Sequence, residues 1–327
     1  MITRRKFVTA LCAGAIAPFS SFAQPSDKVR RIGFLSALSA PAMAAREEAF
    51  RRGLKEFGWL EGKNIAVEYR YADANPARLQ ALVAELSSLR LDAIVSTGPT
   101  TTSALKAAMP AAPIVMGFDN DPVGAGLIAS LAKPGGNITG LSGLSPELSG
   151  KQLQLLKEAI PALSQVTVLG SSTATGNLQA VNAVERVATA LRIDTRFANI
   201  RNLEELKKAV QEARKARTGA FIVLASPAGT NYRTELIQLV LKSRVPAMYY
   251  SSEFVEEGGL MTYGVNIADM FRRSASYVDR ILKGAKPGDL PVEQPTKFDF
   301  VINMRTAKAL GLKIPATILL QATKVID

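Results

Sequence analysis

The chain has 327 residues, of which 47% are hydrophobic and 21% are charged, and these proportions exclude a mainly disordered protein. It contains no histidine and one cysteine, which excludes a Ser-His-Asp or Cys-His catalytic relay and a zinc site built from histidines or four thiolates. The formal net charge is +12, and Arg4, Arg5 and Lys6 carry three of the positive charges in a segment with the features of a removable signal.

Residues 1–23 have the three-part pattern of an export signal. Residues 3–7 are basic, residues 8–19 are apolar and uncharged, and residues 21–23 place small side chains where a signal peptidase reads the chain. The paired arginines resemble a twin-arginine (Tat) signal. The apolar run is too short to span a bilayer, and no later segment is long enough. These features predict a cleaved, Tat-like signal peptide and a mature protein in the periplasm.

The first half of the mature chain alternates between strand and helix patterns. Strands are predicted at 30–35, 65–71, 92–96 and 113–118. Residues 40–59 have the spacing of an amphipathic helix, with Arg46 and Glu47 on its charged outer face. A second helix begins at Asn75-Pro76, because proline is well placed in the first turn of a helix.

The alternation restarts after residue 143. Strands are predicted at 166–169, 193–200, 221–224, 246–248, 258–265 and 297–302. Helices are predicted at 147–160, 177–191, 203–216, 234–241 and 270–282, and one more ends at Leu310. Such an order indicates parallel sheets covered by helices on both faces.

The elements after residue 258 have no lobe of their own, so we expect them to complete the two earlier sheets. The sequence therefore predicts an α/β protein of two doubly wound parallel-sheet lobes joined by a hinge of several crossings. Lobe 1 is expected to cover 29–142 and 264–292, and lobe 2 to cover 143–263 and 293–327.

Polar and aromatic residues gather where the predicted strands end. In open α/β sheets, ligands bind beyond these carboxyl ends, where helix N-termini offer free N–H groups. The residues at these ends are Ser36, Ser96, Thr97, Pro99, Thr100, Phe118, Asp119, Asn120, Asp121, Ser171, Ser172, Ser226, Tyr249, Tyr250, Ser251 and Ser252. Hydroxyls and helix N-termini suit a carboxylate, aspartate suits an ammonium, and aromatic rings suit an apolar body. Taken singly, each serine or threonine also fits an ordinary helix N-cap, and Asp121-Pro122 also fits a turn.

Other binding motifs are incomplete. Residues 145–152 lack the first glycine and the hydroxyl residue of a phosphate-binding loop, and residues 124–129 stand too far from the preceding strand for a dinucleotide fingerprint. Basic residues are interleaved with acidic ones, as on a solvated helix face, which does not favour a nucleic-acid partner.

Six phrases in chain order carry a family resemblance. They are FGWLEGKN at 57–64, VEYR at 67–70, DPVGAGL at 121–127, KPGGNITG at 133–140, GLMTYG at 259–264 and QPTKF at 294–298. Together they resemble the ABC-transporter substrate-binding family that includes tryptophan- and tyrosine-binding members. The likeness covers residues 29–327 and implies a type I periplasmic-binding-protein fold. Such a protein closes two lobes on a small solute and presents it to a membrane permease.

The resemblance implies that ligand contacts come from the strand-end loops. Carried over to this sequence, these are Ser36, Thr97, Gly98, Pro99, Thr100, Phe118, Asp119, Asp121, Ser171, Ser172, Ser226, Tyr249, Tyr250 and Glu253. The sequence departs from its relatives at 170–172, where many carry an Asn-Pro turn, and at 250–253, where a more basic, aromatic loop is usual. Both departures lie at the expected cleft, so they leave the identity of the ligand open.

These observations predict a monomeric periplasmic solute-binding component of an ABC importer, with a permease and its ATPase as partners. It would bind an amino acid or a related carboxylate without catalysis, cofactor or metal. Thr97, Thr100 and Ser171 would hold the carboxylate, and Asp119 or Asp121, aided by Glu253, the ammonium.

Two alternatives remain. A solute-sensing subunit that acts on a membrane receptor would have the same fold. A hydrolase or isomerase could use Asp119 and Asp121 as an acid/base pair, but the chain has no histidine and no recognised nucleophile motif.

Overall fold

The computed structural model describes residues 29–143, 145–174, 176–295 and 298–327. The expected signal peptide at 1–23 lies outside these residues. No helix in the described part of the chain is both long and apolar enough to cross a membrane.

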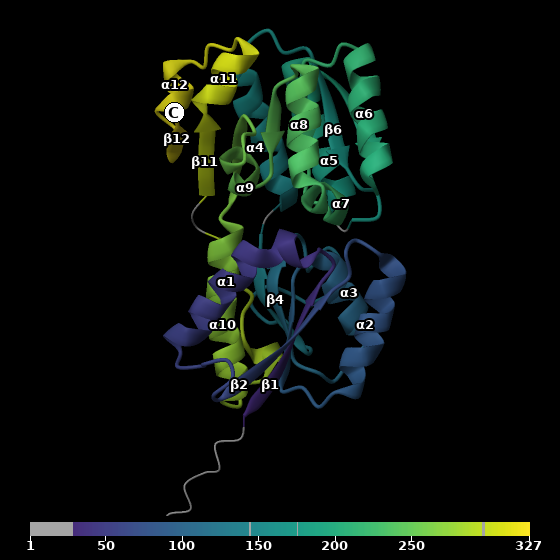
Figure 1. Cartoon of the computed structure of the whole chain (residues 1–327), viewed down its shortest axis with the longest axis vertical. Helices are drawn as coiled ribbons and strands as arrows, with labels where there is room; N and C mark the ends of the chain where they lie inside the picture. Colours follow the sequence, from purple (N-terminus) through teal and green to yellow (C-terminus); the bar gives the residue numbers. More distant parts are fainter. Residues whose placement is uncertain (1–28, 144, 175, 296–297) are drawn as a thin grey trace, which may run out of the picture.

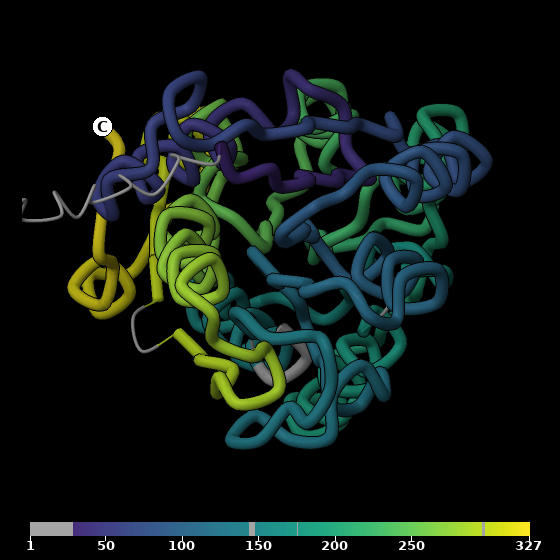
Figure 2. Tube along the Cα trace, turned by 90° about the horizontal axis from the view of Figure 1, so that it is seen from below, coloured from purple at the N-terminus to yellow at the C-terminus, as the bar shows by residue number. Residues whose placement is uncertain are grey.

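Lobe 1 is built on a five-stranded sheet in which all neighbouring strands are parallel, in the order β2-β1-β3-β4-β5. Its strands are β1 (Arg30–Ser36), β2 (Ile65–Tyr71), β3 (Ala93–Ser96), β4 (Ile114–Asp119) and β5 (Ile138–Ser142). Its helices are α1 (Ala40–Glu56), α2 (Pro76–Ser88), α3 (Pro99–Ala108) and α10 (Ile267–Leu282). Neighbouring residues of β1 point to opposite faces of the sheet. The Phe34 ring packs against Phe271 of α10, whereas Leu35 belongs to the buried cluster that includes Leu79 of α2. Figure 2 shows α1 and α10 on one side of this lobe and α2 and α3 on the other.

Lobe 2 is built on a seven-stranded sheet in the order β12-β11-β10-β9-β8-β6-β7. Figure 1 shows this lobe above lobe 1, with β12 and β11 on its left side. Its strands are β6 (Gln165–Gly170), β7 (Asp194–Asn199), β8 (Ala220–Val223), β9 (Ala247–Tyr249), β10 (Met261–Val265), β11 (Phe298–Asn303) and β12 (Lys324–Ile326). Its helices are α4 (Ser145–Ala159), α5 (Asn177–Leu191), α6 (Leu203–Lys215), α7 (Pro227–Asn231), α8 (Arg233–Ser243), α9 (Ser252–Glu256), α11 (Met304–Leu310) and α12 (Ala316–Leu319).

The chain crosses between the two sheets three times: from β5 to α4, from β10 to α10, and from the short 3₁₀ turn η1 (Pro287–Asp289) to β11. Two of these crossings are tied together, because Ser142 N–H donates to the Glu293 carbonyl at 2.9 Å. Helix α10 returns to lobe 1 and packs closely along α1, and this approach requires glycine at position 53, where a β-carbon would collide with the Arg272 carbonyl.

The predicted α/β class with two parallel-dominated sheets is confirmed, with one correction. Strand β11 runs antiparallel to β10, whereas every other neighbouring pair is parallel. The reason is the hinge: β10 carries the chain out of lobe 2 toward α10, and β11 brings it back from the same side. The elements β5, α3, α7, α9, α12 and β12 were not predicted from the sequence, and all of them except α3 have five residues or fewer.

Candidate functional site

A pocket lies between the two lobes, at the carboxyl ends of strands from both sheets. It has an empty volume of about 530 Å3, its open mouth included. Lobe 1 contributes Ala37, Leu38, Arg46, Thr97, Gly98, Pro99, Thr100, Thr101, Phe118 and Asn120. Lobe 2 contributes Ala174, Ala225, Ser226, Pro227 and Tyr250, and Ile267 comes from the crossing into α10.

The wall in lobe 1 is dominated by the N-terminus of α3. Gly98 is its N-cap residue, and no side chain caps the first turn, so the N–H groups of that turn remain available to an anion. The turn is held by other bonds: Thr97 N–H donates to Thr101 Oγ1 at 3.1 Å, and Thr101 Oγ1 donates to the Gly98 carbonyl at 2.8 Å. A side chain on Gly98 would meet nothing within 4 Å, because the pocket opens at this residue.

The wall in lobe 2 is made of groups that bond to one another. Ser226 Oγ accepts from Gly229 N–H at 3.1 Å and so caps α7. The Tyr250 hydroxyl bonds to Thr230 Oγ1 at 2.5 Å, and its ring packs edge-on against Phe254. Tyr250 therefore offers the pocket mainly the body of its ring.

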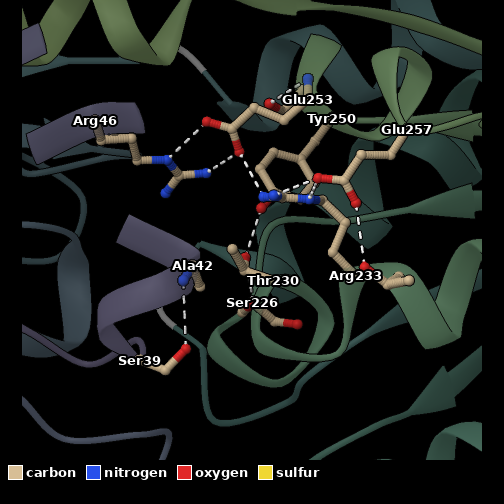
Figure 3. A network of polar contacts seen from close by, with 11 residues as sticks. Ser39, Ala42, Arg46, Ser226, Thr230, Arg233, Tyr250, Glu253 and Glu257 are labelled. Carbon is tan, nitrogen blue, oxygen red and sulfur yellow. Dashed lines mark hydrogen bonds and ion pairs between the residues drawn. The ribbon is translucent and has the colours of Figure 1, made fainter. Parts of the chain in front are cut away.

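Arg46 corrects the sequence analysis, which placed it on the outer face of the first helix. It is 4% exposed and lines the pocket. Its Nε and Nη2 donate to the two carboxylate oxygens of Glu253 at 3.1 and 2.9 Å (Figure 3). Burial alone would lower the pKa of Arg46, but Glu253 and the Tyr250 phenol outweigh it and raise the pKa, so the cation persists in the cleft. Helical spacing in the sequence gave no sign that α1 faces a second lobe here.

The structure brings seven of the predicted site residues to the pocket wall: Thr97, Gly98, Pro99, Thr100, Phe118, Ser226 and Tyr250. It places seven others off the wall: Ser36, Asp119, Asp121, Ser171, Ser172, Tyr249 and Glu253. Most of these are engaged within their own lobe. Ser36 Oγ accepts from Leu38 N–H at 3.0 Å, Ser171 Oγ bonds to Thr173 Oγ1 at 3.0 Å, and Tyr249 is buried against Phe254.

The two aspartates at the end of β4 differ from each other. Asp121 Oδ1 accepts from Gly124 N–H at 2.8 Å and closes a turn. Asp119 is fully buried, and neither of its carboxylate oxygens has a hydrogen-bond partner among the residues that the structure describes. Burial raises the pKa of Asp119 to about 7, against smaller opposing effects of the nearby Thr102 hydroxyl and Asn120 backbone.

The described ranges contain no group of three or more His, Cys, Asp or Glu side chains that could hold a metal ion. The pocket wall thus combines hydrogen-bond donors with apolar surface. The Arg46 cation and the N-terminus of α3 in lobe 1 face aromatic and aliphatic side chains of lobe 2. It can hold a small molecule that has an anionic end and an apolar body.

Comparisons with known proteins agree with this geometry. The family model described as ABC transporter substrate binding protein matches residues 31–326. The tyrosine-binding protein of Clostridioides difficile is 25% identical over 293 residues, which cover 88% of this chain and 83% of that protein.

Two solved structures share the fold. A conserved domain protein of Vibrio cholerae has a TM-score of 0.86 and 28% identity, over 91% of this chain and all of the other. An ABC domain from Streptococcus pneumonia in complex with L-Trp has a TM-score of 0.85 and 24% identity, over 91% of this chain and 99% of the other. The resemblance drawn from the sequence phrases is thereby confirmed, and so is the type I periplasmic-binding-protein fold. The matched family and relatives are solute-binding proteins rather than enzymes.

Proposed function

Because the chain belongs to the ABC transporter substrate-binding protein family, we propose that it is the periplasmic component of an importer for an amino acid or a related carboxylate. It acts as a monomer, without cofactor or metal, and hands its solute to a permease driven by an ATPase. One observation carries the proposal: both lobes line a single pocket in which a buried arginine and an uncapped helix N-terminus lie beside aromatic surface.

The carboxylate of the solute binds to lobe 1. The first turn of α3 supplies backbone N–H groups, and the hydroxyls of Thr97 and Thr100 have no hydrogen bond within the described residues. Arg46 adds a positive charge to the same wall. Ser171, the third predicted carboxylate contact, lies off the wall and is not part of this proposal.

The ammonium of the solute is held less strongly than its carboxylate. Asp119, Asp121 and Glu253 do not line the pocket, so no carboxylate of the described residues lies on its wall to pair with a cation. Hydroxyl oxygens of the wall, such as those of Thr97 and Ser226, are the acceptors that remain. The site therefore requires the carboxylate end of its solute more than the amino end.

The side chain of the solute packs between Phe118 of lobe 1 and Tyr250 of lobe 2, with Leu38 and Ile267 beside them. Aromatic and aliphatic walls favour an apolar or aromatic body. A curated relative named for tyrosine binding and a solved relative in complex with L-Trp support this choice of class.

The test is thermal unfolding of the purified protein with each of the twenty L-amino acids, followed by calorimetry on those that raise the melting temperature. An aromatic amino acid should give the largest rise. Calorimetry with L-tryptophan, indole-3-propionate and tryptamine then separates the two ends of the solute. Tryptamine, which lacks the carboxylate, should lose far more affinity than indole-3-propionate, which lacks the amine. If no amino acid or simple carboxylate raises the melting temperature, the proposed ligand class is wrong, although the fold stands.

A further inference from the structure

Several direct contacts join the lobes around the pocket, and Arg46 also interacts with the Tyr250 phenol across the cleft. On the side of α1, Arg46 binds Glu253 through two parallel hydrogen bonds, and Ser39 N–H donates to Asn231 Oδ1 at 3.0 Å. On the opposite side, Asn120 of lobe 1 lies against Gly176 of lobe 2. The pocket is therefore enclosed between contacts that can exist only while the lobes are together.

Among these contacts, the Arg46–Glu253 ion pair has the strongest electrostatic attraction. Arg46 is 4% exposed and the Glu253 side chain 16%, so water screens the pair weakly. The two-fold geometry of an arginine–carboxylate pair is also the strongest that charged side chains form. Burial by itself would raise the pKa of Glu253, but the guanidiniums of Arg46 and Arg233 hold it below its usual range.

The two ends of this pair are anchored differently. Glu253 also accepts from Arg233 Nη1 at 3.0 Å, and Arg233 in turn binds Glu257, all within lobe 2 (Figure 3). Within the described residues, Glu253 is the one acid that pairs with Arg46. When the lobes separate, Glu253 therefore keeps a partner, whereas Arg46 has to exchange its partner for water.

We propose that Arg46 and Glu253 form an inter-lobe latch that holds the cleft closed, with Glu253 acting as a positioning residue that contacts no ligand. Arg233 presets the Glu253 carboxylate on lobe 2, so that Arg46 meets an ordered acceptor when the lobes come together. The latch contributes to ligand affinity by raising the fraction of molecules whose two pocket walls are in register.

The asymmetry predicts an order of effects. Removing the charge of Glu253 leaves the Arg46 guanidinium buried in the closed form with the Tyr250 phenol but without a carboxylate partner, which is unfavourable. Removing the charge of Arg46 leaves Glu253 with Arg233, which costs less. Glu253→Gln should therefore open the cleft more than Arg46→Gln does. Scattering of the ligand-free variants tests this order, and a cleft that is more open in Arg46→Gln than in Glu253→Gln would contradict the asymmetry.

The first measurement is small-angle X-ray scattering of the ligand-free protein, so it does not depend on the proposed function. Wild-type scattering should fit the closed structure, and Glu253→Gln should give a larger radius of gyration. Glu257→Gln is the matched control, because it removes an ion pair of the same network that stays within lobe 2. It should scatter like the wild type. A wild-type curve as expanded as that of Glu253→Gln overturns the latch.

The second measurement is the affinity for L-tryptophan as the probe, and this arm rests on the proposed function. Glu253→Gln should weaken binding by roughly 10- to 100-fold, and Glu257→Gln by no more than about two-fold. Arg46→Gln is not used in this measurement, because Arg46 also lines the pocket beside the carboxylate of the solute. Unchanged affinity in Glu253→Gln overturns the latch. If the wild type does not bind L-tryptophan, that failure concerns the ligand class, and the scattering result alone decides the latch.

Discussion

The two walls of the pocket are built in opposite ways. In lobe 1, helix α3 begins at a glycine without a side-chain cap, and Asp119, buried just behind the wall, has no hydrogen-bond partner among the described residues. In lobe 2, Ser226 caps α7 and the Tyr250 hydroxyl is bonded to Thr230. The wall of lobe 1 thus has polar groups without a protein partner, whereas the polar groups on the wall of lobe 2 are bonded to one another.

This difference indicates an order of events. Unpaired donors gain most from a ligand, because an unsatisfied polar group costs more than a hydrogen bond contributes on average. Whenever the latch opens, the solute should therefore bind first to lobe 1, where the N–H groups of the first turn of α3 are available to an anion. Lobe 2, whose groups on the pocket wall are already bonded to one another, should then close over the solute as a preformed lid.

The largest effect is expected where lobe 1 opens to the solute. In Gly98→Leu the new side chain enters the pocket without a clash, since nothing lies within 4 Å of its β-carbon and the backbone is extended. The protein should fold normally and lose affinity for its amino acid by at least ~1,000-fold, or about 4 kcal/mol. Calorimetry measures the loss.

Gly136→Leu is the matched control for this change. It adds the same side chain at an exposed glycine of lobe 1 that also has nothing within 4 Å, remote from the pocket wall. It should bind like the wild type. Undiminished binding in Gly98→Leu would show that the solute does not occupy the space in front of α3, and the contrast between the walls would lose its functional meaning.

The fold and the site were not equally predictable from the sequence. The order of apolar strands and amphipathic helices determines which elements form the sheets, and the strand ends follow from it. Which residue at a strand end faces the cleft does not follow, because neighbouring residues point in opposite directions. Phe118 lines the pocket while Asp119 does not, and Tyr250 does while Tyr249 does not.

Arg46 illustrates a second limit. It follows Met43 by three residues and precedes Phe50 by four, so it lies on the buried side of α1, and its placement on the outer face was wrong. Helical spacing also does not show that a second lobe covers α1 at this residue. The spacing of apolar residues predicts which side of a single helix is buried. It cannot predict an ion pair with Glu253, which lies 207 residues further along the chain. Long-range pairs of this kind require the arrangement of both lobes.

The next effect concerns the buried acid behind the wall of lobe 1. Burial in the folded protein raises the pKa of the Asp119 carboxyl from 3.8 to about 7. As the pH rises between these values, the unfolded state loses its proton first, so wild-type stability should fall. The Asp119→Asn variant has no carboxyl group at this position, so its stability should not fall over this pH range. Its advantage over the wild type should grow from near zero at pH 4 to at most about 4 kcal/mol at pH 8.

Chemical denaturation at a series of pH values measures this advantage, and the convergence of the two proteins at pH 4 serves as the internal control. A difference that does not change with pH would mean that Asp119 finds a partner when folded. The polar group behind the wall of lobe 1 would then be hydrogen-bonded like those of lobe 2, and the two lobes would not differ at this residue.

The smallest effect is expected in lobe 2, where the polar groups are already paired. Tyr250→Phe removes the hydrogen bond to Thr230 and should destabilise the protein by about 1 kcal/mol, while Thr230 still donates to the Ser226 carbonyl at 2.8 Å. Tyr249→Phe is the matched control, because the hydroxyl of this neighbouring buried tyrosine has no hydrogen bond within the described part of the chain. Urea denaturation should show no loss of stability in that control, because removing an unpaired buried hydroxyl does not break a hydrogen bond.

Affinity distinguishes the two possible roles of the Tyr250 hydroxyl. If it serves only the internal bonding of lobe 2, Tyr250→Phe keeps the ring that contacts the solute, and the affinity for L-tryptophan should change by less than about five-fold. A loss of ~100-fold with little change in stability would mean that the hydroxyl turns from Thr230 to the ligand. In that case lobe 2 also supplies polar recognition, and it would be a second binding wall rather than a preformed lid.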